Sequence, residues 1–228
     1  MWQEIRSELH PKGLEVVTIA LDTGGAEAAG HWIERAHPEH PSLIDQAHVT
    51  DELFGFYNVP NGVWIDEDGM IVRPAEPASP PMPRRDWPVT DDMPDNMKEM
   101  LAEANKIRAE PEKYVAALRD WVEKGSESVY ALAPDEVVEK SRPRSEDKAT
   151  AAARFELGQY LFRQGKHDDA IPHWREAHRL DFDNWTYKRQ AWFLSDPLQG
   201  PTEHYDGDWT SDIKKIGAEN YYPALDMP

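Results

Sequence analysis

The chain has 228 residues, a formal net charge of −18 and no cysteine. This length suits one large or two small domains, and the charge disfavours binding to nucleic acid or to anionic membranes. Thiol–disulfide exchange requires a thiolate, so the sequence as it stands cannot carry out that reaction. No apolar run is long enough to cross a bilayer and no signal segment opens the chain, which predicts a soluble, cytoplasmic protein without a membrane partner.

The first third of the sequence alternates helical and strand patterns. Trp2, Ile5 and Leu9 recur at helical spacing. The β-branched apolar run over 14–21 predicts a buried parallel strand. The other elements expected in this part are a helix over 26–36, a strand over 41–45, a helix over 49–57 and a hairpin over 63–72 that turns at Glu-Asp-Gly.

Four segments of this part form an ordered pattern. They are Gly13-Leu14-Glu15-Val16-Val17, Pro41-Ser42-Leu43-Ile44-Asp45, Tyr57-Asn58-Val59-Pro60 and Ile65-Asp66-Glu67-Asp68-Gly69-Met70-Ile71-Val72. In order and spacing, the four segments resemble the TlpA/ResA-like (redoxin) branch of the thioredoxin-like superfamily, from its second strand onward. The resemblance implies a thioredoxin-like α/β domain over residues 1–75.

The resemblance also implies a substrate-binding position. Members of the family hold the peptide bond before one proline in cis, and the backbone of the residue before it pairs with an extended substrate next to the redox cysteines. Carried over to this sequence, the substrate-binding residues are Val59 and Pro60, with a cis bond between them. An ordinary loop proline is the alternative, since cis X-Pro bonds are uncommon.

The family's first strand and redox motif have no counterpart in the sequence. In the family this strand lies inside the sheet, between the strands that resemble 14–21 and 63–66, and its loss would leave costly unpaired backbone groups. We therefore expect the catalytic motif upstream of Met1. Some ResA-like proteins resemble selenoproteins, and a selenocysteine codon read as a stop would restart a gene model at the next Met. A mis-assigned start or a shortened sequence is the alternative.

Two functions follow from these expectations. The resemblance implies a thiol or selenol oxidoreductase that acts on a protein thiol, a disulfide or a peroxide. The rival is a non-catalytic protein-binding scaffold with a degenerate thioredoxin-like domain. No Gly-rich phosphate loop is present, and we expect no cofactor.

The remainder of the sequence predicts a linker and a helical domain. Residues 76–91 are too rich in proline for a helix and predict an extended linker. Helical periodicity over 97–107, 111–124 and 134–140 predicts an all-helical domain over 92–228. The predicted fold class is thus α/β plus all-α.

Residues 151–184 contain small and aromatic residues at a regular helical-hairpin spacing. Leu157, Gly158, Ala170, Trp174 and Ala177 are expected to form the packing seam, and Gly165 marks the turn. This segment resembles a tetratricopeptide repeat, in which small residues let two helices approach closely. One repeat cannot bury its own face, so neighbouring helices or a protein partner should cover it.

Other polar groups give weaker signals. His37, His40 and His48 match no structural zinc spacing, and exposed loop histidines are the favoured interpretation. Asp66 to Gly69 is interpreted as a hairpin turn rather than a calcium loop. Asp168 or Asp169 is expected to cap the second helix of the hairpin.

Overall fold

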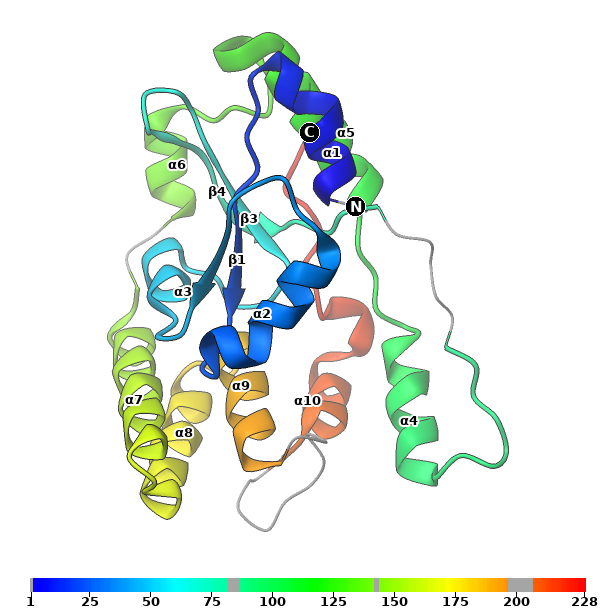
Figure 1. Cartoon of the computed structure of the whole chain (residues 1–228), viewed down its shortest axis with the longest axis vertical. Helices are drawn as coiled ribbons and strands as arrows, with labels where there is room; N and C mark the ends of the chain where they lie inside the picture. The colour runs from blue at the N-terminus through cyan, green and yellow to red at the C-terminus, as the bar shows by residue number, and fades with distance from the viewer. Residues whose placement is uncertain (1, 82–86, 142–143, 197–206) are drawn as a thin grey trace.

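The computed structural model describes residues 2–81, 87–141, 144–196 and 207–228. This part of the chain contains four strands and ten α-helices, so the fold is mixed α/β (Figure 1). The strands are β1 (Thr18–Leu21), β2 (Ser42–Asp45), β3 (Asn61–Ile65) and β4 (Ile71–Pro77). The helices are α1 (Trp2–Leu9), α2 (Gly25–Ala36), α3 (Val49–Phe54), α4 (Asp95–Ala104), α5 (Pro111–Lys124), α6 (Pro134–Lys140), α7 (Glu146–Arg163), α8 (His167–Leu180), α9 (Trp185–Ser195) and α10 (Trp209–Ile216).

The strands form two separate pairs. β1 pairs in parallel with β2, from Thr18 opposite Ser42 to Leu21 opposite Asp45. β3 pairs antiparallel with β4, and within the described residues no ladder joins the two pairs. Each pair therefore has a strand edge on either side that no other strand covers.

The strand expected over 14–21 is present, but the expectation that it is buried is wrong. The strand itself is confirmed, but it covers only Thr18–Leu21, and all four of its residues are partly exposed. Neither hydrophobic cluster of the described chain includes a residue of β1 or β2. A strand that is paired on one edge and packed against no core cluster cannot become fully buried.

The expected hairpin is confirmed. The Asp66 carboxylate accepts hydrogen bonds from the backbone N–H groups of Asp68, at 3.0 Å, and Met70, at 2.8 Å. Gly69 takes a φ of 78°, a conformation that glycine adopts at little cost. β4 continues to Pro77, so the first two residues of the expected linker belong to the hairpin.

The helix ends follow local chemistry. α3 stops at Phe54, before the expected end at Tyr57, because Gly55 takes a φ of 73° and donates its N–H to the Asp51 carbonyl at 2.9 Å. α5 and α6 begin with Pro111 and Pro134, residues whose fixed φ suits the first helical position.

The helical hairpin expected over 151–184 is present. α7 and α8 are joined at Gly165, which has a φ of 74°. The N-cap of α8 is Lys166 and its side chain makes no capping hydrogen bond, so the expectation that Asp168 or Asp169 caps the helix is wrong. Both acids lie in the first turn instead, where negative charge favours the helix dipole.

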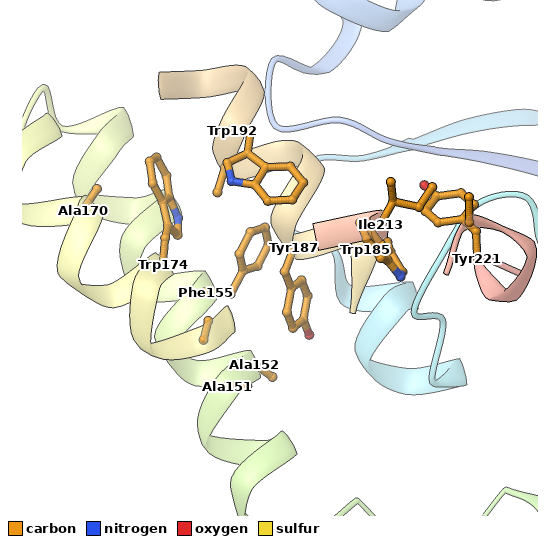
Figure 2. Packing of buried hydrophobic residues seen from close by; sticks show 13 residues of the cluster. Ala151, Ala152, Phe155, Ala170, Trp174, Trp185, Tyr187, Trp192, Ile213 and Tyr221 are labelled. Carbon is orange, nitrogen blue, oxygen red and sulfur yellow. The ribbon is translucent and has the colours of Figure 1, made fainter. Parts of the chain in front are cut away.

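Two hydrophobic clusters hold the fold together. The first joins α7, α8, α9, α10 and the segment after α10; Figure 2 shows its side chains, including Phe155, Trp174, Tyr187 and Trp192. The rings of Phe155 and Tyr187 stack with centroids 4.2 Å apart. The second cluster contains residues from α1, β3, the position after β4, α5 and the C-terminal end of the sequence: Ile5, Leu9, Trp64, Ala78, Tyr114, Val115, Ala117, Leu118, Leu225 and Met227. This cluster contains side chains from both sides of the linker expected at 76–91.

Candidate functional site

The loop before β3 contains the expected substrate-binding pair. The peptide bond between Val59 and Pro60 is cis, as the family resemblance implies. Val59 is 45% exposed, so the loop reaches the surface of the protein. Substrate binding by these two residues stays a prediction.

The cis-proline loop is held by the C-terminal part of the chain. Asn58 is buried, and its side-chain amide donates to the Tyr221 carbonyl at 3.0 Å while its amide oxygen accepts from the Val59 N–H at 2.8 Å. One residue earlier, the Tyr57 carbonyl accepts from the Trp185 N–H at 2.6 Å. These bonds fix the backbone that leads into the proline.

Both backbone polar groups of Val59 make hydrogen bonds within the protein. Its N–H donates to Asn58, and its carbonyl accepts from the Tyr222 hydroxyl at 2.8 Å. An extended substrate that paired with this residue would have to displace one or both of these internal partners. The Tyr222 hydroxyl therefore occupies the position that the resemblance assigns to substrate.

Asn58 and Tyr222 are functional candidates that the sequence reasoning missed. The contacts of Asn58 with Tyr221 and of Tyr222 with Val59 each join positions 163 residues apart. No local sequence pattern predicts a contact over that separation. The only available signal was the position of Asn58 immediately before the Val59–Pro60 pair.

A polar contact ties the end of β1 to the helical hairpin. The Thr23 hydroxyl accepts from the Gln159 amide at 2.9 Å, and the Thr23 N–H donates to the Gln190 amide oxygen at 3.3 Å. Thr23 and Gln159 are buried. The β1–β2 pair is thus fixed to α7 and α9 through hydrogen bonds rather than through an apolar core.

Two titratable side chains, His48 and Asp51, are buried at the start of α3. His48 is buried and lies edge-on to the Phe155 ring at 5.1 Å; burial lowers the pKa of His48 to about 4. Asp51 is 2% exposed, and burial raises the pKa of its carboxyl to about 7. Both groups are shifted toward their neutral forms.

The packing seam of the α7–α8 hairpin contains four of its five expected residues. Ala170, Trp174 and Ala177 are buried, and a side chain at Gly158 would place its Cβ 2.5 Å from Trp174 Cδ1. Leu157 is 40% exposed, so its assignment to the seam is wrong. Adjacent helix positions point about a quarter turn apart, and in α7 the glycine faces Trp174 while Leu157 points outward.

The histidines do not lie as expected. His37 is exposed, but His40 and His48 are buried, so the interpretation of all three as exposed loop residues is wrong. Within the described ranges, no group of three or more His, Asp or Glu side chains is arranged to hold a metal ion.

Comparisons with known proteins identify no family. No family model matches the chain, and no curated protein or solved structure resembles it significantly. Among the helices of the described residues, none has the length and apolar character that a membrane crossing demands.

Proposed function

We propose that this chain is the scaffold of a thioredoxin-like oxidoreductase, completed by one further strand that carries a cysteine or selenocysteine. The observation that carries the proposal is the combination of a cis Val59–Pro60 bond with two strand pairs that no ladder joins in the part of the chain that the structure describes. The inserted strand pairs with β1 on one edge and with β3 on the other.

The unfilled edges support the insertion. Backbone N–H and C=O groups along a sheet edge are strong hydrogen-bonding groups that favour pairing with another strand. The apolar side chains next to these edges are also incompletely covered: Val17 is 52% exposed and Ile65 is 46% exposed. A strand between the two pairs would satisfy these backbone groups and cover this apolar surface.

The redox chemistry belongs to the inserted strand. A thiolate or selenolate after that strand attacks one sulfur of a substrate disulfide, which forms a mixed disulfide (or selenenyl sulfide) and releases the other sulfur as a thiolate. With a peroxide it attacks one oxygen, which breaks the O–O bond, releases an alkoxide or hydroxide and leaves a sulfenate or selenenate; in both cases a thiol reductant restores the starting group. The cis-proline loop orients a peptide substrate once the Tyr222 hydroxyl leaves the Val59 carbonyl. The present chain contributes the fold and the loop, and it has no cysteine of its own.

The test begins with the coding DNA upstream of Met1, read through any in-frame stop. We expect a strand followed by a motif with cysteine or selenocysteine, in register with the helix that contains Trp2, Ile5 and Leu9. Insulin-disulfide and peroxide reduction are then compared between the extended protein, its variant with serine at the redox position, and the 228-residue chain. Turnover by the extended protein alone supports the proposal. An upstream region without an open frame, or an extended protein as inactive as its serine variant, refutes it.

A specific observation favours a second function, binding of a protein partner by the helical hairpin. Leu157 is 40% exposed and Tyr160 is 53% exposed; they lie three residues apart on α7 and share its outer face. An exposed leucine–tyrosine pair suits a helix-binding partner. Replacing both with serine should abolish co-purification of a partner while lowering the melting temperature by only a few degrees, because both side chains are exposed. Unchanged co-purification would reject this surface.

A further inference from the structure

Large apolar side chains gather on the surface between positions 87 and 100 of the sequence. Trp87, Val89, Met97 and Met100 are all exposed to solvent. A single exposed apolar residue is common in proteins, whereas a contiguous group of them marks an interaction site. The arrangement of these side chains on α4 shows whether they form such a group.

One face of α4 is apolar along its length. Met97, Met100, Leu101 and Ala104 recur at i, i+3, i+4 and i+7, so they share that face. Both methionines are exposed, and Leu101 and Ala104 are only half-buried. The apolar face of α4 is therefore incompletely covered by the rest of the protein.

The segment before α4 brings Trp87 to the C-terminal end of this face. The Trp87 N–H donates to the Asn105 amide oxygen at 2.9 Å, and the Trp87 carbonyl accepts from the Asn105 side-chain amide at 3.0 Å. Asn105 is the C-cap of α4 and lies one turn after Leu101. Two backbone hydrogen bonds thus hold the exposed Trp87 beside the apolar face.

Another side of α4 attaches it to the protein. α10 packs against α4, and Lys214 of α10 forms an ion pair with Glu99. Glu103, one turn after Glu99, is buried and accepts from Lys106 at 2.7 Å. Figure 1 shows α4 at the edge of the molecule, beside α10. The face that contains the two methionines is thus free to contact a partner.

The surroundings of this face are acidic. Between positions 87 and 105 the sequence has five acidic residues and one basic residue, Lys98, which lies 3.6 Å from Asp95. With Lys106 and Lys214, which pair with two of these acids, the negative charges still outnumber the positive ones by five to three. Asp91 and Asp92 are exposed immediately before α4. This balance favours a cationic partner and repels an anionic one.

We propose that α4 and residues 87–94 bind a basic amphipathic helix of a partner protein. The apolar side chains of that helix contact Trp87 and the two methionines of α4, and its Lys or Arg side chains pair with Asp91 and Asp92. Methionine is flexible and polarizable, so it adapts to the shape of an apolar partner. Helices that bind in this way present apolar anchors at i, i+3, i+4 and i+7. This surface is independent of the redox proposal.

The test measures fluorescence anisotropy with the 228-residue chain and three labelled peptides of about 18 residues, or about five helical turns. The first peptide carries leucine at i, i+3, i+4 and i+7 positions and lysine elsewhere. The second has glutamate in place of lysine, and the third has the composition of the first in an order that forms no apolar face. We expect the first peptide to bind at least about tenfold more tightly than either of the others, because the second lacks the matching charge and the third the matching face.

Two double substitutions locate the binding surface. Met97→Ser with Met100→Ser should weaken binding of the lysine peptide about tenfold, because the loss of apolar anchors at the centre of an interface has effects of this size. Asp91→Asn with Asp92→Asn should weaken binding at low salt and reduce the salt dependence of the affinity. All four side chains are exposed, so both variants should fold, and circular dichroism verifies this.

Matched controls remove the same groups from the hairpin between β3 and β4. Met70→Ser removes an exposed methionine, and Glu67→Gln with Asp68→Asn removes two exposed carboxylates; neither change should alter the affinity. The proposal is overturned if the lysine peptide does not bind, if either of the other peptides binds as tightly, or if the controls weaken binding as much as the α4 variants. Binding that is lost with serine at Leu157 and Tyr160 but kept in the α4 variants would place the peptide on α7 and overturn it as well.

Discussion

The contact between Gly158 and Trp174 predicts that a single added methyl group destabilises the protein. In Gly158→Ala the new Cβ would lie 2.5 Å from Trp174 Cδ1 and Nε1, well inside the ordinary separation of roughly 3.5–4.0 Å between carbon atoms. Trp174 is only 1% exposed and lies in the first hydrophobic cluster, so the ring cannot swing out into solvent. One of the two helices must shift.

Two effects of opposite sign determine the magnitude. Replacing glycine with alanine inside a helix stabilises it by about 1 kcal/mol, whereas overpacking of a tight core costs about 1–3 kcal/mol. Since the approach is so short and the ring so buried, we expect the overpacking to dominate and the free energy of unfolding to fall by up to about 2 kcal/mol. In a protein of this size, the melting temperature would fall by about 2–4 °C for each kcal/mol.

In the double mutant, the effect of Gly158→Ala on the free energy of unfolding should have the opposite sign. Trp174→Ala alone should cost about 3–5 kcal/mol, but in that background the added methyl group meets no ring. Gly158→Ala should then stabilise the protein by about 1 kcal/mol. Gly30 serves as the matched control, because it lies inside α2 and a Cβ there would meet nothing within 4 Å; Gly30→Ala should stabilise.

The stabilities of the parent, the two single mutants, the double mutant and the Gly30→Ala control are measured by urea unfolding, followed by circular dichroism and tryptophan fluorescence. A Gly158→Ala protein more stable than the parent would show that the ring does not abut the glycine. Additive effects in the double mutant would likewise refute the contact, since residues in contact should couple.

Further changes test single side chains. Leu157→Ala should lower the free energy of unfolding, measured by urea unfolding, by less than about 1 kcal/mol, because the side chain is half-exposed. A loss as large as that for a buried leucine would show that Leu157 belongs to the packing seam. Folding raises the pKa of Asp51 from 3.8 to about 7. Its contribution to the free energy of unfolding is therefore greatest below pH 4 and is lost as pH rises toward 7, at up to about 1.4 kcal/mol per pH unit. Asp51→Asn should flatten this part of the stability–pH profile, and an unchanged profile would contradict the pKa shift. Folding lowers the pKa of His48 from 6.5 to about 4, so the contribution of this residue to the free energy of unfolding is present above pH 6.5 and is lost as pH falls. Asparagine tolerates the left-handed backbone at this position, so His48→Asn should make the protein less sensitive to acid unfolding. Equal acid sensitivity of the two proteins would refute the pKa shift. Tyr222→Phe removes the donor to the Val59 carbonyl and should speed amide exchange in the cis-proline loop, as hydrogen-exchange mass spectrometry would report; unaltered exchange would mean that the hydroxyl does not hold the loop.

Local chemistry made part of this structure predictable from sequence. The bounds of α5 and α6 match the expected ranges because each helix begins at a proline, and the hairpin between β3 and β4 turns where the Glu-Asp-Gly segment predicts. The cis bond before Pro60 and the close packing of α7 against α8 at Gly158 are also present, but these expectations came from family resemblances. Local sequence alone predicted the helix starts and the hairpin turn, whose signals lie within a few residues of one another.

Long-range packing determined what the sequence did not reveal. The apolar run of β1 predicts burial, but burial depends on what packs against a strand, and neither core cluster reaches it. The contact between Thr23 and Gln159 joins positions 136 residues apart, so no sequence window could contain it. The exposure of Leu157 has a similar origin, because helical spacing cannot specify which face a neighbouring helix covers.

The route of the last residues has a consequence for how the protein is made. Leu225 and Met227 belong to the cluster that also contains Ile5, Leu9 and Trp64, and the Asp226 carbonyl accepts from the Arg73 guanidinium at 2.7 Å. On a ribosome Ile5 and Leu9 emerge long before Leu225 and Met227, so this cluster cannot close until more than two hundred further residues have been made. A nonsense codon just before Leu225 would therefore deprive α1 and β3 of two core side chains.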